Sequence, residues 1–531
     1  MQISKFTPTR AFFTPHEEIE LKICLESHQP VRVNLRVTIQ HMQCEAARVE
    51  QEVVLPAGER WITLSLPLTN SQPHGYGLKA ELLDSAHKIL DCKYSAVDTL
   101  ERWIDFPQYG FLTDFTAQRA DLETALDSLA EYHINGIQFY DWQYRHDELL
   151  SPYEDFVDPL GRSLSMKTVR SLIEGAHRHG MAAMPYLAIY AASLEFCSTH
   201  PDWQLFDAQG KALDFEGFLG LMDPTPGSPW IDHLLRECCL ALSGMPFDGL
   251  HVDQYGEPKI AYNNHGEMVD LPLAFKEFIA RLKETFPKQA VVFNAVGNWP
   301  IDSLASSRQD FIYIEIWPPA VTFRDLRQIV TEARSKSGGK PVVIALYLPA
   351  SQPVNIRLAN AVIMASGGSR IELGENTRLL SDPYFPKHQA ISPELAQAMQ
   401  ANQDFLVRYS ELLGPSANQI ELPGLQLPPG VLAIVRRSTS SWCVNLINFT
   451  GMDSPRWDQP QPAPVPLQEV NITIPLPEMP EAIWAASPDA ASPELLALPF
   501  TYQEGRVQLN LPELHYWSIL VIQLKHEVAI K

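Results

Sequence analysis

The chain has 531 residues, of which 45% are hydrophobic and 20% charged, a composition typical of globular rather than disordered proteins. This length exceeds what one ordinary core organises, so we expect two to four domains. The formal net charge of −22 repels nucleic acid phosphates and anionic membrane surfaces, which argues against both as partners and favours a neutral or cationic one.

The first thirty residues contain no apolar run that would form the h-region of a signal peptide, and no later segment is apolar for long enough to span a bilayer. We therefore expect a cytoplasmic protein, or an extracellular one whose leader is absent from this chain. The seven cysteines are scattered without CxxC or Cys/His metal spacing, which favours buried free thiols. The sequence gives no indication of the oligomeric state.

Residues 5–97 consist of short runs in which polar and apolar residues alternate. Examples are EIELKICL, VRVNLRVTIQ, RWITLSLPL and YGLKAELLD. Turns rich in Pro, Gly, Asn and Ser separate these runs, a pattern typical of an antiparallel β-sandwich. We predict such a domain over residues 1–100.

From about residue 108 the pattern changes to short apolar strands that alternate with amphipathic helices. Eight strands are predicted, at residues 109–115, 136–142, 182–190, 249–255, 291–296, 311–317, 342–347 and 370–375. Helical stretches follow most of them, as in AQRADLETALDSLAEYH and FRDLRQIVTEARSK. Eight such units predict a catalytic (β/α)8 TIM barrel over residues 101–415, with an open α/β sheet as the alternative.

After about residue 425 the alternating pattern returns in GVLAIVRRS, SWCVNLINFT, VNITIPL and HYWSILVIQL. These runs predict a C-terminal antiparallel β-domain, taken as residues 416–531. The order of sandwich, barrel and β-domain is common among enzymes that act on polysaccharides, although fold-level analogy alone carries little weight.

Two carboxylates stand where a barrel enzyme has its catalytic residues, at the carboxyl ends of strands. In FIYIEIW, Glu315 shares one face of the strand with Tyr313 and Trp317, and three isoleucines share the other face. Because the isoleucine face packs against helices, Glu315 points into the barrel mouth. Asp253 alternates in the same way in GLHVDQY and also points inward, next to His251.

Asp253 and Glu315 end the fourth and sixth strands, whose backbones lie roughly 9–10 Å apart. Inward side chains converge in a barrel, so a carboxyl separation of ~5–6 Å is expected, which suits a retaining glycosidase. Glu315 has the drier surroundings that raise the pKa of an acid, whereas Asp253 is better placed to stay ionised. We therefore assign Asp253 as nucleophile and Glu315 as acid/base, with a structural hydrogen bond or ion pair as the alternative for either residue.

Other chemistries find less support. His177 and His179 stand at a helix C-terminus, where capping is a better explanation than metal binding. No GxSxG, P-loop or dinucleotide-binding fingerprint occurs in a valid context, so we expect no cofactor and no metal in the site. A structural calcium ion stays open, although no EF-hand-like loop is present.

Several segments resemble glycoside hydrolase family 66, the dextranases and cycloisomaltooligosaccharide glucanotransferases. They are YGFLTDF, HINGIQFYDWQYRH, FDGLHVDQYGEP, VVFNAVGNWPIDSLASSRQDFIYIEIW, IELGE followed by YFP, and LINFTGMDSPRWD, in the order of the family. The resemblance implies an N-terminal immunoglobulin-like domain, a (β/α)8 barrel and a C-terminal antiparallel β-domain. It also implies retaining cleavage or transfer of α-1,6-glucan, with the nucleophile motif on Asp253 and the acid/base motif on Glu315.

The same resemblance implies that side chains at the ends of the strands hold a glucosyl ring by stacking and hydrogen bonds. The expected substrate-binding residues are Tyr140, Asp141, Trp142, Tyr190, His251, Asn294, Trp317, Tyr347 and Glu375. The alternative for the aromatic residues at the end of the second strand is that they only pack beneath a loop and do not contact the substrate. For Glu375 the alternative is that it only orders its loop.

Cyclising members of the family carry a carbohydrate-binding module inserted in the catalytic domain, and the stretch from Tyr190 to Gly249 is too short for one. We therefore favour hydrolysis of dextran or isomaltooligosaccharides over formation of cyclic or elongated products at the same site. A non-catalytic α-glucan-binding protein is the third hypothesis. Because dextran does not enter cells, a cytoplasmic protein would act on imported isomaltooligosaccharides.

Overall fold

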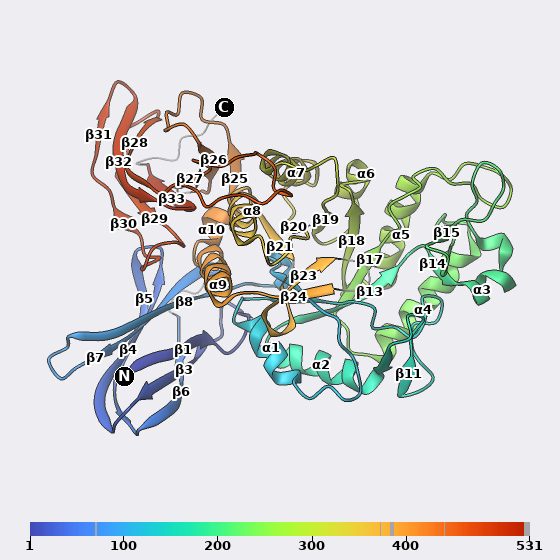
Figure 1. Ribbon diagram of the computed structural model, residues 1–531, viewed down its shortest axis with the longest axis horizontal. Helices are drawn as coiled ribbons and strands as arrows, with labels where there is room; N and C mark the ends of the chain where they lie inside the picture. The colour runs from blue at the N-terminus through green and yellow to red at the C-terminus, as the bar shows by residue number, and fades with distance from the viewer. Residues whose placement is uncertain (69–71, 372, 383–386, 440, 525–531) are drawn as a thin grey trace.

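The computed structural model describes residues 1–68, 72–371, 373–382, 387–439 and 441–524. It is a multidomain, sheet-rich molecule. Figure 1 shows the N-terminal strands in blue and the C-terminal strands in red on the same side of a central parallel sheet, with two orange helices between them. The loops that extend from the central sheet form the opposite end of the molecule.

The N-terminal strands form two sheets. One has the order β1 (Gln2–Pro8), β3 (Ile19–Ser27), β6 (Gly58–Leu66); the other has the order β2 (Phe12–Phe13), β8 (Ile89–Thr99), β7 (Gly75–Leu83), β4 (Val31–His41), β5 (Cys44–Leu55). All pairs are antiparallel except β2 with β8. Every second residue of β4 from Val33 to Ile39 is buried in one cluster with the apolar face of β3, as the alternating pattern predicts.

Within the described residues, the central sheet has a parallel strand at each of the eight predicted positions. They are β9 (Tyr109–Leu112), β10 (Gly136–Phe139), β13 (Ala182–Ala188), β17 (Gly249–Asp253), β18 (Ala290–Val296), β19 (Ile312–Glu315), β20 (Val342–Ala345) and β21 (Gly368–Ile371), and each pairs with the next. The following β22 (Leu373–Gly374) pairs with β9 through Gly374 and Phe111. The sheet therefore curls until its last segment meets its first strand. Residue 372 of the predicted eighth strand and the YFP motif at residues 384–386 lie outside the described residues.

Helices follow the parallel strands and cover the outside of the sheet (Figure 1). They are α1 (Leu122–Ala130), α2 (Met166–Arg178), α4 (Pro229–Gly244), α5 (Leu271–Thr285), α6 (Ile301–Ala305), α7 (Phe323–Lys336) and α8 (Pro353–Ala365). Ile312 and Ile314 pack into the cluster that these helices share, whereas Tyr313 belongs to a separate inner cluster with Phe311. The two faces predicted for FIYIEIW are therefore confirmed.

Short elements decorate the loops and edges of the sheet. They are η1 (Trp103–Asp105), β11 (Asp155–Val157), β12 (Ser163–Ser165), β14 (Ala191–Ser193), α3 (Leu194–Thr199), η2 (Pro201–Trp203), β15 (Asp214–Phe215), β16 (Leu219–Leu221), η3 (Glu375–Thr377), β23 (Arg378–Asp382) and β24 (Lys387–Ala390). β11 pairs with β12, and β16 lies between β14 and β15. These small sheets belong to the loops after β10 and β13, which the sequence patterns do not predict.

The C-terminal strands form two further sheets. The larger sheet has the order β25 (Asn418–Ile420), β26 (Val431–Arg437), β27 (Ser441–Asn448), β33 (Trp517–Gln523), β29 (Ala482–Ala486), β30 (Leu496–Ala497). The smaller sheet has the order β28 (Leu467–Pro475), β32 (Arg506–Leu514), β31 (Phe500–Gln503). All their pairings are antiparallel. The helices α9 (Pro393–Arg408) and α10 (Ser410–Leu413) connect this part to the central sheet.

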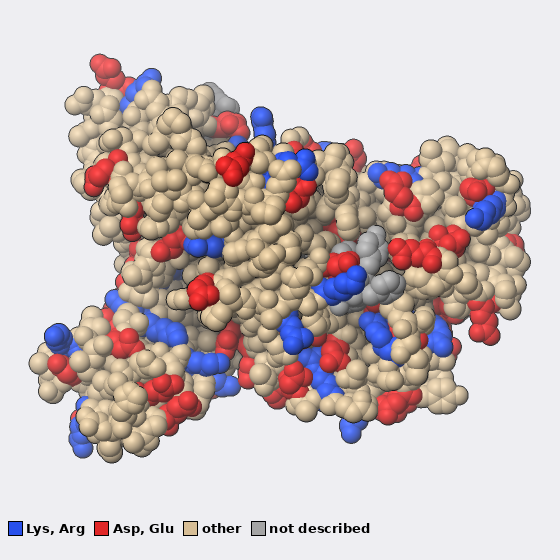
Figure 2. Space-filling model, viewed as in Figure 1, with Lys and Arg blue, Asp and Glu red and all other residues tan. Residues whose placement is uncertain are grey.

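Acidic and basic side chains are interspersed over the face shown in Figure 2, without a large basic patch. Across the described residues, the structure has no helix with the length and apolar character needed to cross a membrane. All seven cysteines are free. The prediction that the thiols are buried is confirmed for Cys24, Cys197, Cys238 and Cys443, but Cys92 is only partly buried, and the prediction is wrong for the exposed Cys44 and Cys239. Both stand at polar positions of their elements, Cys44 beside a hairpin turn and Cys239 on the outer face of α4.

Candidate active site

Three adjacent strands bring two carboxyl groups and one amide together. Asp253 is the last residue of β17, Glu315 is the last residue of β19, and Asn294 lies on β18 between them. The Nδ2 atom of Asn294 donates to Oδ1 of Asp253 at 2.8 Å and to Oε2 of Glu315 at 2.9 Å. Because both oxygens bond to one nitrogen, they lie no more than about 5.7 Å apart.

Both carboxyl groups have raised pKa values. Burial raises the pKa of Glu315 to about 7, and the negative charge of Asp253 acts in the same direction. Burial also raises the pKa of Asp253 to about 6, although hydrogen bonds from the Gln254 N–H, Asn294 and the Tyr186 hydroxyl oppose the rise. The higher value belongs to Glu315, as the sequence predicts, but Asp253 does not keep the low pKa of an ordinary aspartate.

A third carboxyl group follows β10. Asp141 has a left-handed backbone (φ 51°), a conformation that Asp tolerates better than most residues and that often occurs at functional sites. Its Oδ2 lies 3.4 Å from Nη2 of Arg162, which also pairs with Asp158 at 2.6 Å. Burial raises the pKa of Asp141 to about 6, and the positive charge of Arg162 limits the rise.

These groups surround a cavity that opens to solvent; its unfilled space, counted together with that open solvent, is about 830 Å³. Of the residues predicted for the site, Asp253, Glu315, Tyr140, Asp141 and Tyr190 line it. The remaining wall is formed by Gln143, His146, Asp158, Pro159, Leu160, Arg162, Tyr186, Phe215, Phe218, Leu219, Gln254, Tyr255 and Val296. The wall thus combines charged groups with aromatic rings.

Three other predicted residues contact the carboxyl groups and do not line the cavity. Asn294 is buried and bonds to both Asp253 and Glu315. Tyr347 and Trp317 have ring centroids 6.2 Å apart, and hydrogen bonds from both side chains lower the pKa of Glu315. The structure places all three next to Glu315 and not among the residues that line the cavity, so the substrate contact predicted for them stays a prediction.

Trp142 and His251 lie in the core instead of at the cavity wall. Trp142 is fully buried, and its Nε1 donates to the carbonyl of Tyr186 at 3.2 Å. The expectation of a rim position assumed a strand that continues to residue 142, but β10 ends at Phe139 and the left-handed turn at Asp141 directs the indole into the core. His251 is also buried, and this burial lowers its pKa to about 3. Its Nδ1 lies 3.1 Å from the hydroxyl oxygen of Tyr109.

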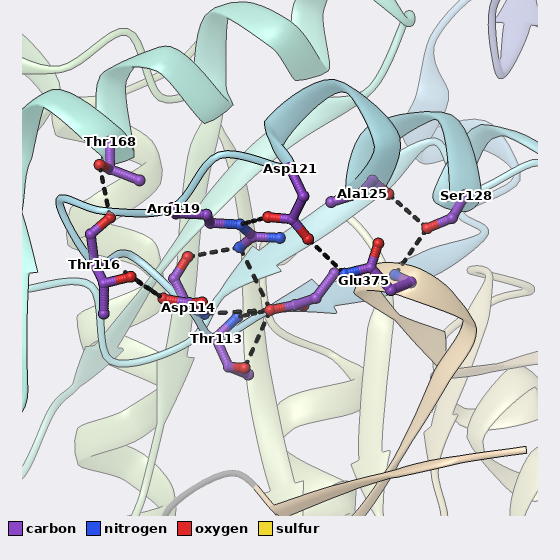
Figure 3. A network of polar contacts seen from close by, with 10 residues as sticks. Thr113, Asp114, Thr116, Arg119, Asp121, Ala125, Ser128, Thr168 and Glu375 are labelled. Atoms are coloured by element: carbon purple, nitrogen blue, oxygen red, sulfur yellow. Dashed lines mark hydrogen bonds and ion pairs between the residues drawn. The ribbon is translucent and has the colours of Figure 1, made fainter.

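Glu375 orders the loop after β9 (Figure 3). Its Oε1 accepts hydrogen bonds from the N–H groups of Thr113 and Asp114 at 3.2 Å and from the Thr113 hydroxyl, and it lies 3.5 Å from Nη1 of Arg119. Asp121 holds the same guanidinium from its other side and also accepts a hydrogen bond from Asn376. These contacts match the loop-ordering alternative for Glu375, which does not line the cavity.

The cavity wall also contains Asp158, Arg162 and Tyr186, which were not among the residues predicted from the sequence. Period-2 alternation along AAMPYLAIY was a usable signal for Tyr186, because Met184 of that strand lies in the inner cluster and Tyr186 follows on the same face. Arg162 enters the site through the β11–β12 hairpin, whose turn Asp158 closes by accepting hydrogen bonds from the backbone N–H groups of Leu160 and Arg162. The turn is readable from Asp-Pro-Leu-Gly, but its position beside Asp141 is not.

The side chains at the cavity do not form a group of three metal-type ligands in the described part of the chain, where such a group occurs at His41, His74 and Glu411. None of these three residues lines the cavity. The groups available at the cavity are therefore suited to proton transfer and nucleophilic attack by carboxyl groups.

Comparison with known proteins gives one family match across most of the chain. The model of glycosyl hydrolase family 66 matches residues 8–521. A cycloisomaltooligosaccharide glucanotransferase of Niallia circulans is 22% identical over 81% of this chain and 63% of its own length. A dextranase of Streptococcus salivarius is 22% identical over 72% of this chain and 55% of its own length. The chain thus spans less than two thirds of these two relatives.

A solved structure has the same fold. It is a cycloisomaltooligosaccharide glucanotransferase of Paenibacillus sp., complexed with cycloisomaltoheptaose, with a TM-score of 0.91 and 19% sequence identity. The superposition covers 98% of this chain and 99% of the other. At this level of identity the agreement concerns the arrangement of the strands and helices.

Proposed function

Because the chain belongs to glycosyl hydrolase family 66, we propose that it cleaves α-1,6-glucosidic linkages of dextran or isomaltooligosaccharides with retention of configuration. In this proposal Asp253 is the nucleophile and Glu315 the general acid/base. The observation that carries it is the single amide of Asn294, which bonds to both carboxyl groups at the carboxyl edge of the parallel sheet.

The distance between the carboxyl groups supports retention. Retaining glycosidases hold their carboxyl groups ~5–5.5 Å apart, whereas inverting enzymes need ~6.5–9.5 Å to admit a water molecule. The limit of about 5.7 Å between the bonded oxygens of Asp253 and Glu315 agrees with the shorter range. Burial and the negative charge of Asp253 both raise the pKa of Glu315, whereas three hydrogen bonds favour the ionised form of Asp253, so Glu315 is the better group to carry the proton.

The proposed reaction has two displacements. The carboxylate of Asp253 attacks the anomeric carbon while the proton of Glu315 moves to the glycosidic oxygen, so the C–O bond breaks and the shortened glucan leaves. Glu315, now ionised, takes a proton from a water molecule whose oxygen attacks the same carbon and releases Asp253. Each displacement inverts the carbon, and the two together retain the α configuration.

We propose that the cavity wall holds the glucosyl ring. Tyr140 and Tyr190 offer ring faces, and Asp141, fixed by Arg162, offers a hydrogen-bond acceptor near the carboxyl pair. Trp317 and Tyr347 act on the acid through hydrogen bonds to Glu315. Asn294, placed beneath both carboxyl groups, is a positioning residue.

A glucanotransferase is the second candidate, because the relatives at 22% identity include both a dextranase and a cycloisomaltooligosaccharide glucanotransferase. The chemistry is the same until the glycosyl-enzyme forms, and then a glucan hydroxyl replaces water as the acceptor. We favour hydrolysis on the basis of the short segment from Tyr190 to Gly249.

We further infer a (β/α)8 barrel at residues 101–415, between an immunoglobulin-like sandwich at residues 1–100 and an antiparallel β-sandwich domain at residues 416–531. The eight consecutive parallel pairings and the contact of Gly374 with Phe111 support the barrel. A cytoplasmic location stays a prediction, which fractionation of the source cells tests.

The experiment that tests the proposed function is a chromatographic product profile after incubation with dextran and with short isomaltooligosaccharides, using starch as the control. Linear isomaltooligosaccharides from dextran, with starch untouched, are the predicted result. Cyclic or elongated products would assign the chain to the transferases. Absence of products from all of these glucans would contradict the substrate class.

A variant separates an enzyme from a non-catalytic glucan-binding protein. Asp253→Asn removes the nucleophile and is expected to abolish turnover while dextran binding persists. Asp302→Asn is the matched control, because its side chain is 85% exposed and its ion pair with Lys336 is worth little. If both variants and the unmodified chain bind dextran alike and none releases sugar, the chain is a binder.

A further inference from the structure

A second cluster of chemically active side chains joins the N-terminal strands to the helix α10. His41 ends β4, His74 directly precedes β7, and Glu411 lies on α10. The Nε2 of His41 is 2.5 Å from Oε2 of Glu411, and Nδ1 of His74 is 2.8 Å from Oε1. One ligand atom from each of the three residues lies within 4.8 Å of the others.

The packing around the cluster fixes its geometry before any ligand is bound. The two imidazole rings stack with centroids 4.6 Å apart and an angle of 25° between their planes. A Cβ at Gly75 would lie 1.8 Å from the carbonyl oxygen of Val407, so strand β7 approaches the end of α9 as closely as only glycine permits. This contact seats α10, and with it Glu411, against the two histidines.

The donor set has the character of a metal site. The Nδ1 of His74 is buried and lies 2.8 Å from Oε1 of Glu411. Nε2 of His41 and Nδ1 of His74 face the two oxygens of one carboxylate, so two nitrogen donors and one oxygen donor from three separate elements converge on one point.

We infer that His41, His74 and Glu411 bind one divalent transition-metal ion of the zinc class. Two imidazole nitrogens and a carboxylate oxygen, with water as the fourth ligand, are ordinary zinc donors. Zinc bonds of ~2.0–2.1 Å place the ligand atoms of a tetrahedral ion roughly 3.3 Å from one another. The carboxylate oxygens of Glu411 now lie 2.5 and 2.8 Å from the imidazole nitrogens, so they would have to move away from the two rings by less than about one ångström. The ion would cross-link β4 and the start of β7 to α10, away from the cavity.

The exposed thiol of Cys44 is a competing ligand that the test has to separate. Cys44 stands opposite His41 in the β4–β5 pair, and directly opposed residues in a sheet have neighbouring side chains. Cys44→Ser therefore belongs among the controls. His87→Gln is the second control, because His87 also pairs with a glutamate, Glu50, at 3.3 Å but is not part of a group of three ligands.

The experiment is a Zn²⁺ titration of the full chain, previously treated with a chelator, by competition with a chromophoric zinc indicator. We expect one equivalent of tightly bound zinc. His41→Gln, His74→Gln and Glu411→Gln should each weaken binding at least about 10–100-fold, since they remove ligands. Cys44→Ser and His87→Gln should bind as the unmodified chain does. Circular dichroism establishes that each variant is folded.

A thermal melt gives a second measurement that does not depend on the indicator. Zinc that binds only the folded chain raises its midpoint of unfolding, and this rise should vanish in His74→Gln and persist in His87→Gln. Undetectable binding to the unmodified chain, or equal binding by the three ligand variants, would overturn the inference. Loss of binding in Cys44→Ser with retention in His41→Gln would also overturn it, because it would assign the metal to the thiol.

Discussion

Removal of the amide that joins the two carboxyl groups is expected to move the whole pH profile. In Asn294→Ala, Asp253 and Glu315 each lose a hydrogen bond that favours the ionised form, so both pKa values rise. The nucleophile then becomes ionised only at higher pH, and the acid keeps its proton to higher pH. Both limbs of the profile should therefore shift upward.

The size of the shift follows from the strength of such bonds. A hydrogen bond to a charged group contributes ~1.5–3 kcal/mol, and one pKa unit corresponds to about 1.4 kcal/mol. Asp253 is partly accessible from the cavity, where water replaces some of the lost bond. We therefore expect an upward shift of about one unit in the acidic limb, toward the low end of that range.

The assay is kcat/KM against pH on a short isomaltooligosaccharide, since this ratio reports the pKa values of the free enzyme. Asn264→Ala, an exposed loop asparagine, is the control and should leave the profile unchanged. A folded Asn294→Ala variant with reduced activity but unmoved limbs would refute the reasoning, because the amide would then serve only to hold the backbone.

Three further predictions concern pH and packing. The unmodified chain should have a bell-shaped kcat/KM profile whose activity falls below about pH 6, where Asp253 gains a proton, and above about pH 7, where Glu315 loses one; a profile still rising at pH 9 would show that Glu315 is not the general acid. Trp142→Ala should destabilise the fold by ~3–5 kcal/mol, measured by chemical denaturation, and a cost below about 1 kcal/mol would place the indole at the surface. Gly75→Ala should lower the thermal midpoint, because its methyl group meets the backbone of Val407; an unchanged midpoint would show that α9 does not pack closely there.

The strands and the carboxyl pair were predictable because they rest on local alternation. The isoleucines around Glu315 specify which face of β19 meets the helices, and the same logic orients Asp253 on β17. The bridging role of Asn294 was not predictable, since it depends on the register between β17, β18 and β19. A slip of one residue would turn the amide to the other face, and no residue pattern fixes that register.

The cavity wall was predictable only in part because loops form much of it. Trp142 was misplaced because the left-handed turn at Asp141 cannot be read from residue types, although Asp is among the few residues that accept it. Arg162, which lies 21 residues after Asp141 in the chain, reaches it from the β11–β12 hairpin, a contact set by loop conformation rather than by periodicity.

The anomeric form of the first product tests the central claim most directly. Proton NMR spectra recorded immediately after addition of the chain to an isomaltooligosaccharide distinguish the α anomer from the β anomer before mutarotation mixes them. Two displacements at Asp253 with Glu315 as acid/base predict that the α anomer appears first. Initial release of the β anomer would show a single displacement and contradict the account.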